Sequence, residues 1–244
     1  MTAGLLRTDH HVHSTWSDDA VSTTWANLAA ARDAGLASIR MVDHVRTSTT
    51  YVPEFLAEVA ALPPVEGLEV LTGVEAKIVD ATGRLDVPAD LVVGDGGVDR
   101  VLIADHQFPG PDGPWSPRRT LAEIEAGLHP QDALDVLVTA TVRAMDRVPR
   151  AQLAHLFSLL PKIGLHESAL SDDHLAEIAT AAVRTGTTVE VNEKWRCPGP
   201  RVVLAFAVAG VTLVGSTDSH EASSVGRYPW VAGALATERL AGVR

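Results

Sequence analysis

A histidine-rich segment near the amino terminus holds the side chains best suited to chemistry. Residues 9–13 read Asp-His-His-Val-His and follow two leucines, so we predict the end of a buried strand there. Alternate side chains of a strand share one face, which puts Asp9, His11 and His13 together. Two imidazoles about 7 Å apart on one face can converge on one metal ion or on two neighbouring ions. The sequence therefore predicts a metal site, with Asp9 able to orient His11.

The elements that would position such a site alternate between short apolar runs and helical patterns. Besides the first strand, we expect strands over 38–42, 68–74, 100–104, 151–154, 187–191 and 211–215. Helices are expected over 23–34 with Ser22 as the N-cap, and over 53–62, 130–147, 172–184, 200–209 and from about 230. The glycine-rich segment 93–98 predicts a turn, and its glycines lack the spacing of a phosphate-binding loop. The segment 108–117, rich in Gly and Pro, predicts a loop over one face.

Alternating strands and helices predict a parallel sheet with right-handed crossovers, either closed into a barrel or open. Polar residues follow nearly every predicted strand. These residues are His11, His13, Asp18, His44, Glu75, His106, His155, Asp218 and His220. The carboxyl ends of all strands surround one mouth in a barrel, whereas an open sheet would spread these side chains along a line. The distribution therefore favours a barrel.

Composition limits the class of protein. The 244 residues fit one domain, 1–244, and a net charge of −11 argues against a surface that coats nucleic acid. The single cysteine, Cys197, excludes an intramolecular disulfide and fits a reducing compartment. We see no signal peptide, and the apolar run over 202–215 is short for a membrane span of ~20 residues. We therefore expect a cytoplasmic protein that does not contact membranes.

The motifs also resemble those of a known family. In chain order they are Asp9-His10-His11-Val12-His13-Ser14 with Ser17-Asp18, Val42-Asp43-His44, Gly73-Val74-Glu75, His106, Ala154-His155, Glu190-Val191-Asn192 and Ser216-Thr217-Asp218-Ser219-His220. This set is similar to the polymerase and histidinol phosphatase (PHP) family, over essentially the whole chain. The chain departs from the family pattern at His10, where an apolar residue is more usual, at Asp19, where Gly is common, and at Ser219. None of these departures removes a ligand.

The resemblance implies a distorted (β/α)7 barrel, similar to a TIM barrel, with three divalent ions of Zn, Mn or Fe. The nine polar residues after the strands would hold the ions, with Glu75 as a bridge and with Glu75, Asp218 and His220 as the catalytic set. His11 and His13 would share one ion with Asp218. The second ion would be held by His44 and Asp18, and the third by His106 and His155. The reaction would be attack of a metal-activated hydroxide on a phosphate ester.

Basic residues near the site would bind the phosphate of a substrate. Lys77 and Lys194 each lie two positions after a site motif, and Arg196 and Arg227 follow strand ends closely. A guanidinium can bind phosphate through two hydrogen bonds. These four residues are the predicted substrate-binding set. The alternative for each of them is a solvated surface residue that does not contact substrate.

The sequence analysis leads to a phosphoesterase acting on a small organic phosphate monoester, of the histidinol phosphatase type. The alternative within the same family is a nuclease or a phosphatase of nucleotide 3′,5′-bisphosphates, in which nucleic acid would be a substrate. Two other classes are an interaction module with structural metals and a metal hydrolase of amide bonds. The complete ligand set argues against the first, and the family resemblance at Glu75, His106 and the Asp218-x-His220 pair implies phosphate esters and not amides. The oligomeric state stays open.

Overall fold

The computed structural model describes residues 2–240, and their side chains over 4–234. Seven parallel strands form one sheet in the order β1-β2-β3-β4-β7-β8-β9. Their bounds are Thr8–Val12 for β1, Ser38–His44 for β2, Glu69–Lys77 for β3, Arg100–Ala104 for β4, Gln152–Ala154 for β7, Thr188–Asn192 for β8 and Leu213–Ser216 for β9. A parallel bridge between Val12 and Ser219 brings the two edges of the sheet together beyond β9. The predicted TIM-like distorted barrel of seven strands is therefore confirmed.

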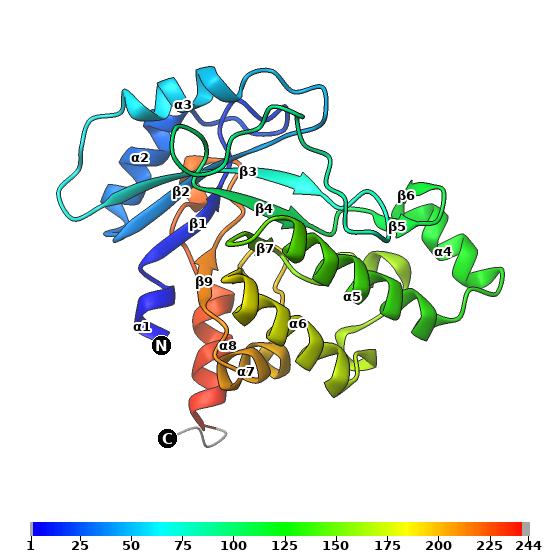
Figure 1. Ribbon diagram of the computed structural model, residues 1–244. Helices are drawn as coiled ribbons and strands as arrows, with labels where there is room; N and C mark the ends of the chain where they lie inside the picture. Colours follow the sequence, from blue (N-terminus) through cyan, green and yellow to red (C-terminus); the bar gives the residue numbers. More distant parts are fainter. Residues whose placement is uncertain (1, 241–244) are drawn as a thin grey trace.

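Helices cover the outside of the sheet (Figure 1). They are α1 (Thr2–Leu5), α2 (Thr24–Asp33), α3 (Val52–Ala60), α4 (Pro117–Glu125), α5 (Pro130–Arg147), α6 (Asp172–Thr185), α7 (Pro200–Val208) and α8 (Pro229–Leu240). Short 3₁₀ turns span Leu160–Ile163, Glu167–Ala169 and Ala222–Ser224. Predicted and observed bounds agree within two residues for most elements, and those of α5 and β4 are identical to the prediction. No helix in the described part of the chain is long and apolar enough to cross a membrane.

Two local predictions were wrong, and one helix was missed. The N-cap of α2 is Thr23, whose hydroxyl accepts from the backbone NH of Ala26 at 3.2 Å, and not Ser22. The segment predicted as a loop pairs Phe108–Gly110 (β5) with Gly113–Trp115 (β6) as a small hairpin. Helix α4, which directly follows the hairpin, was not predicted, because Leu121 and Ile124 are its only large apolar residues and give too short a pattern.

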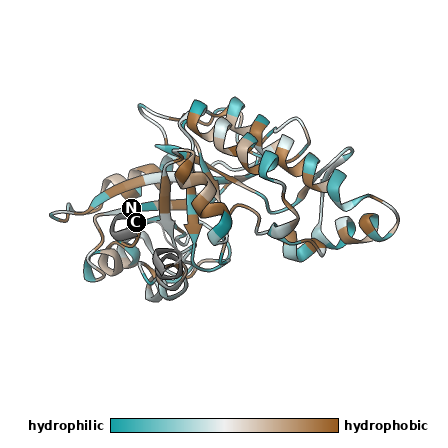
Figure 2. Ribbon diagram, turned by 90° about the horizontal axis from the view of Figure 1, so that it is seen from below, coloured by the Kyte–Doolittle hydropathy of each residue, from teal (hydrophilic) through white to brown (hydrophobic). Residues whose placement is uncertain are grey.

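Apolar side chains fill both the outside and the inside of the sheet. Figure 2 shows brown stretches in the sheet and on the helices around it. Helices α5, α6 and α7 contribute buried Leu137, Ile178 and Phe206 to the largest outer core. A separate small cluster joins Val42, Leu102, Ala104 and Ala154, all at most 1% exposed. Strand register puts these four residues on the same face of the sheet as Glu75. They form an apolar layer inside the barrel that reaches the last residues of β4 and β7.

Candidate metal centre

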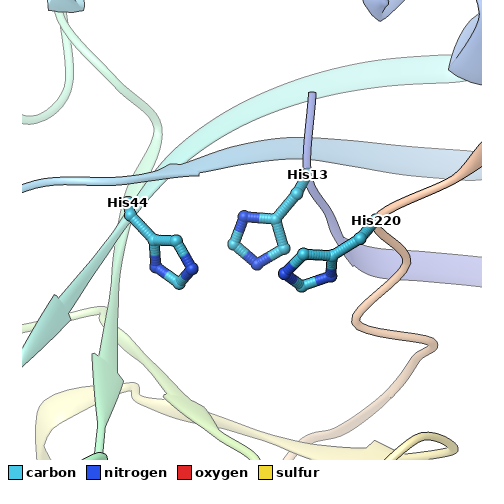
Figure 3. Close-up of side chains that lie close together, drawn as sticks. All are labelled: His13, His44 and His220. Atoms are coloured by element: carbon cyan, nitrogen blue, oxygen red, sulfur yellow. The ribbon is translucent and has the colours of Figure 1, made fainter. Parts of the chain in front are cut away.

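Six histidine rings converge at the carboxyl ends of the strands. His13 follows β1, His44 ends β2 and His220 follows β9, and Figure 3 shows the ring of His13 between the other two. Ring centroids of His13 lie 4.4 Å from His44 and 4.3 Å from His220. The other three are His11, His106 and His155. A barrel mouth is therefore lined with imidazoles from five strand ends.

The carboxylate of Glu75 lies at the centre of these rings and is 2% exposed. Its Oε1 is 3.0 Å from His106 Nε2 and 2.9 Å from His155 Nε2. Its Oε2 is 2.9 Å from His44 Nδ1 and within 3.4 Å of the Nε2 atoms of His11 and His13. Oε2 still accepts no well-formed hydrogen bond. Each oxygen therefore faces a different set of ring nitrogens, as a bridging ligand would.

The donor atoms fall into three groups that could each hold an ion. The groups are His11 with His13 and Asp218, Glu75 with His106 and His155, and His13 with His44 and His220, and the atoms within each lie within 4.8 Å of one another. Eight of the nine predicted ligands take part; Asp18 does not. Two of the groups contain the residues that the prediction placed at one ion each, whereas the third joins His44 to His13 and His220 and lacks Asp18.

Asp18 and its neighbour Asp19 are both exposed and both border the mouth. The carboxylate of Asp19 approaches the rings, with Oδ2 3.1 Å from His220 Nε2 and 3.6 Å from His44 Nε2. No such contact with a histidine is found for Asp18. Although its slight burial acts in the opposite direction, the facing His220 and His44 lower the pKa of Asp19. Sequence analysis noted Asp19 only as a departure from the family pattern.

Buried carboxylates lie behind the histidines and fix their rings. Glu190 Oε2 is 3.1 Å from His11 Nδ1, and Asp105 Oδ1 is 3.3 Å from His155 Nδ1. The Ser17 hydroxyl lies 3.1 Å from His13 Nδ1 and donates to Asp43. Carboxylates in this position orient ligand histidines and raise their basicity.

Asp9 does not have the predicted role behind His11. Its carboxylate accepts from the backbone NH groups of Thr217 and Gly226, both at 2.9 Å, and from the Thr217 hydroxyl. The pairing of β1 with β2 is irregular between Asp9 and Val12, which breaks the strict alternation of faces. Glu190 takes the position behind His11 instead.

Protonation of the histidines reflects these contacts. Burial lowers the pKa of His155, but hydrogen bonds with Asp105 and Glu75 outweigh it and raise the pKa to about 10. The pKa of His11 is also raised, because Glu190 and Glu75 outweigh its burial. Burial dominates at His13, and lowers its pKa to about 4. The histidine charges in turn hold the pKa of Asp218 far below its usual range, against the effect of its burial.

Two ligand candidates have an unusual backbone. His155 and Asp218 adopt positive φ angles of 30° and 52°, a region that non-glycine residues rarely occupy. Such conformations cost of order 1–3 kcal/mol and occur mainly where function requires them. The backbone therefore directs both side chains into the centre at some cost in stability.

A cavity of about 400 Å³ opens above the rings and is called the mouth cavity below. All three lysines of the chain, Lys77, Lys162 and Lys194, border it, together with Trp195. Lys194 Nζ lies 3.4 Å from Asp218 Oδ1, and Lys77 pairs with Asp86 at 3.4 Å. Lys162 Nζ lies 3.8 Å above the Trp195 ring. Lys162 was missed by sequence analysis because it follows no strand end.

The two predicted arginines occupy different places. Arg196 is exposed and does not border the mouth cavity. Arg227 is also exposed and lines an adjacent cavity that shares Lys194, Asp218 and His220 with the mouth cavity. Of the four predicted substrate-binding residues, Lys77 and Lys194 are thus the ones beside the rings.

The donor set fits divalent metal ions. Nε2 of His11 lies 3.0 Å from Nε2 of His13, and both point at the unsatisfied oxygen of Glu75. Imidazole nitrogens and carboxylate oxygens suit Zn, Mn or Fe. Cations between these atoms would satisfy Glu75 and the ring nitrogens together.

No family model matches this chain. Probable phosphatases of Vibrio vulnificus are 33% identical over 105 residues, 42% of this chain and 41% of each relative. A probable phosphatase of Thermoanaerobacter is 35% identical over 86 residues, 34% of this chain and 35% of the relative. The matched segments thus span less than half of the curated relatives.

A solved structure shares the whole fold. Histidinol phosphate phosphatase from Lactococcus lactis, in complex with zinc, L-histidinol and phosphate, superposes with a TM-score of 0.63 at 16% identity. The superposition covers 98% of this chain and 94% of that one. At this identity the likeness establishes the fold.

Proposed function

We propose that this protein is a metal-dependent phosphoesterase that hydrolyses a small organic phosphate monoester. The observation that carries the proposal is the position of Glu75, whose two oxygens face five imidazole nitrogens within 3.4 Å. Similarity to probable phosphatases of Vibrio vulnificus supports the class of reaction. Membership of the PHP family, a trinuclear centre and a cytoplasmic location belong to the same proposal.

The side chains have separate roles in this proposal. The eight clustered ligands would hold up to three divalent ions, which when bound neutralise phosphate charge and activate water. Glu190 and Asp105 hold the rings of His11 and His155 in position. Trp195 donates from Nε1 to Asp218 Oδ2 at 2.5 Å and so fixes this carboxylate at the mouth.

The mouth cavity supports a small anionic substrate. Its volume of about 400 Å³ lies within the range for small ligands. Lys162, in no ion pair among the described side chains, is placed to bind non-bridging phosphate oxygens, next to Lys194. The Lactococcus lactis neighbour was solved with L-histidinol and phosphate, which makes histidinol phosphate one candidate. Arg196 and Arg227 stay proposed as residues that bind the substrate phosphate, although Arg196 does not border the mouth cavity.

Steady-state kinetics with a panel of phosphate esters, including histidinol phosphate and a nucleotide 3′,5′-bisphosphate, tests the proposal. We expect turnover of at least one monoester, and a fall in kcat of at least ~10²-fold in His11→Ala and Asp218→Asn, the order found when one strong electrostatic group is lost. Circular dichroism should show retained fold. Normal turnover in either variant would contradict the assignment of that residue. His129→Ala, at the N-cap of α5, is the matched control.

A further inference from the structure

A second cavity, of about 800 Å³, opens at the opposite end of the barrel. We call it the lower cavity; its borders include Arg40, Arg100, Arg150, Thr188 and the glycine-rich segment 93–97. Arg100 and Thr188 are the first residues of β4 and β8, and Arg40 is the third of β2, so the cavity lies at the amino ends of the strands. It shares no bordering residue with the mouth cavity.

Strand register places these side chains inside the barrel. Arg40 pairs with Leu71, and Gly73, two residues on, pairs with Arg100, so both arginines are on the face that carries Glu75. Gly73 leaves room for Arg40, since a Cβ there would lie 3.1 Å from the Arg40 side chain. The apolar layer of Val42, Leu102, Ala104 and Ala154 lies between these arginines and the metal centre.

Arg40 is a buried cation with unused hydrogen-bonding capacity. It is 3% exposed, and Nη1 donates to the Thr72 carbonyl at 2.7 Å, but Nε has no partner. The hydroxyl of Thr188, which is 7% exposed and borders the same cavity, also has no partner. Buried polar groups are normally paired, and an unpaired one costs about 1–3 kcal/mol. Two such groups at one cavity indicate a ligand.

The border of the lower cavity is predominantly positive, which determines the charge of a ligand that it could bind. Arg40, Arg100 and Arg150 form no ion pair among the described side chains; Arg100 Nη1 donates to the carbonyls of Arg150 and Ala151. Of the two acids at the border, Asp99 already accepts from the backbone NH and hydroxyl of Thr72. Asp95 lies on the exposed glycine-rich segment.

His10, a departure from the family pattern, also belongs to this cavity. Its Nε2 lies 2.8 Å from the Ser38 hydroxyl. The positive charge at this cavity comes from the arginines, and the His10 ring adds a polar group beside them.

We propose that the lower cavity is a second ligand site, specific for a phosphate-type oxyanion and separate from the metal centre. Guanidinium groups present paired NH donors that match phosphate oxygens, and three of them would neutralise a dianion. The free Nε of Arg40 and the Thr188 hydroxyl would complete the contacts. Arg150, with a positive φ of 62°, lies at the entrance and is exposed.

Equilibrium dialysis of the metal-loaded protein against radiolabelled inorganic phosphate tests this site. Arg150→Gln and Arg100→Gln should each weaken one class of phosphate site at least about ten-fold, whereas Arg118→Gln, an exposed arginine on α4, should match the parent. Because these changes touch no metal ligand, the difference between variants reports the lower cavity alone. Arg40→Gln should abolish the site; if it does not fold, the exposed Arg150 still decides.

Three results would overturn the proposal. The first is phosphate binding that is identical in the parent and in Arg150→Gln and Arg100→Gln. The second is an equal loss in Arg118→Gln, which would mean nonspecific attraction. The third concerns acetate, which at matched ionic strength should not displace the bound phosphate. If acetate competes as well as unlabelled phosphate does, the site binds carboxylates and is not specific for phosphate.

Discussion

Glu190 and Asp105 show how much of the centre is fixed by residues that would not touch an ion. Each carboxylate is buried and contacts the outer ring nitrogen of one histidine, so it orients the inner nitrogen toward Glu75. The sequence predicted the eight clustered ligands from their place after strands. It could not predict the pairs behind them, because Glu190 meets His11 across 179 residues and only the fold makes them neighbours.

A comparison of Asp18 with Asp19 decides which carboxylate completes the group of His13, His44 and His220. Asp19 lies 3.1 Å from His220, so Asp19→Asn should lower the metal content by up to one ion per chain and leave the fold intact. Asp18→Asn should have the smaller effect, because Asp18 contacts no histidine of the group. Elemental analysis of the purified variants measures this. A loss of metal in Asp18→Asn alone would contradict this and support Asp18 as the ligand, as the family resemblance implies.

Loading with metal should release protons. A histidine whose pKa is raised holds its proton at every pH below that value, so His155, with a pKa of about 10, is protonated at pH 7 without metal, and the raised pKa of His11 favours its protonated form as well. Ligand nitrogens must lose that proton, so metal affinity should fall as the pH falls, about ten-fold per pH unit for each proton released.

Calorimetry of zinc binding in buffers of different ionisation enthalpy measures the protons released. We expect about two at pH 7 in the parent, and one fewer in His155→Gln. Release of no proton would show that these rings are neutral before the metal binds.

At the scale of elements, sequence periodicity predicted nearly every helix and strand. Helical apolar periodicity predicted α5 and α6, and a short continuous apolar run predicted β4. The hairpin of β5 and β6 was predicted as a loop because its strands contain Pro109, Gly110, Gly113 and Pro114, which are uncommon in strands. The prediction failed because it used propensity, whereas packing of Phe108 against Trp115 holds the hairpin.

Closure of the barrel depends on a close approach at β9. A Cβ on Gly215 would lie 2.2 Å from the Leu5 carbonyl oxygen, which is backbone and cannot move aside cheaply. Gly215→Ala should therefore lower the free energy of unfolding by about 1–3 kcal/mol, the usual cost of overpacking. Urea denaturation measures this. Gly4→Ala, where no atom lies within 4 Å of the added Cβ, is the control and should be neutral. Equal stability of both variants would contradict the tight closure.

At the scale of the whole molecule, the barrel has two polar ends, and along β2 and β4 the apolar residues Val42, Leu102 and Ala104 lie between them. The metal end could be predicted, since its ligands follow strands in sequence. The lower cavity could not, because Arg40, Arg100 and Thr188 lie within or at the start of strands and resemble ordinary strand residues until the sheet closes. A net charge of −11 likewise conceals this local cluster of arginines.

The central claim is that phosphate ester hydrolysis depends on ions held by the clustered ligands. The most direct test is to remove metal with a chelator, confirm the metal-free state by elemental analysis, and titrate Zn or Mn back while measuring turnover of a phosphate monoester. We predict that chelation abolishes turnover and that activity returns with an end point near three ions per chain. Turnover that persists without metal, or a protein that binds less than one ion per chain at saturation, would contradict the account.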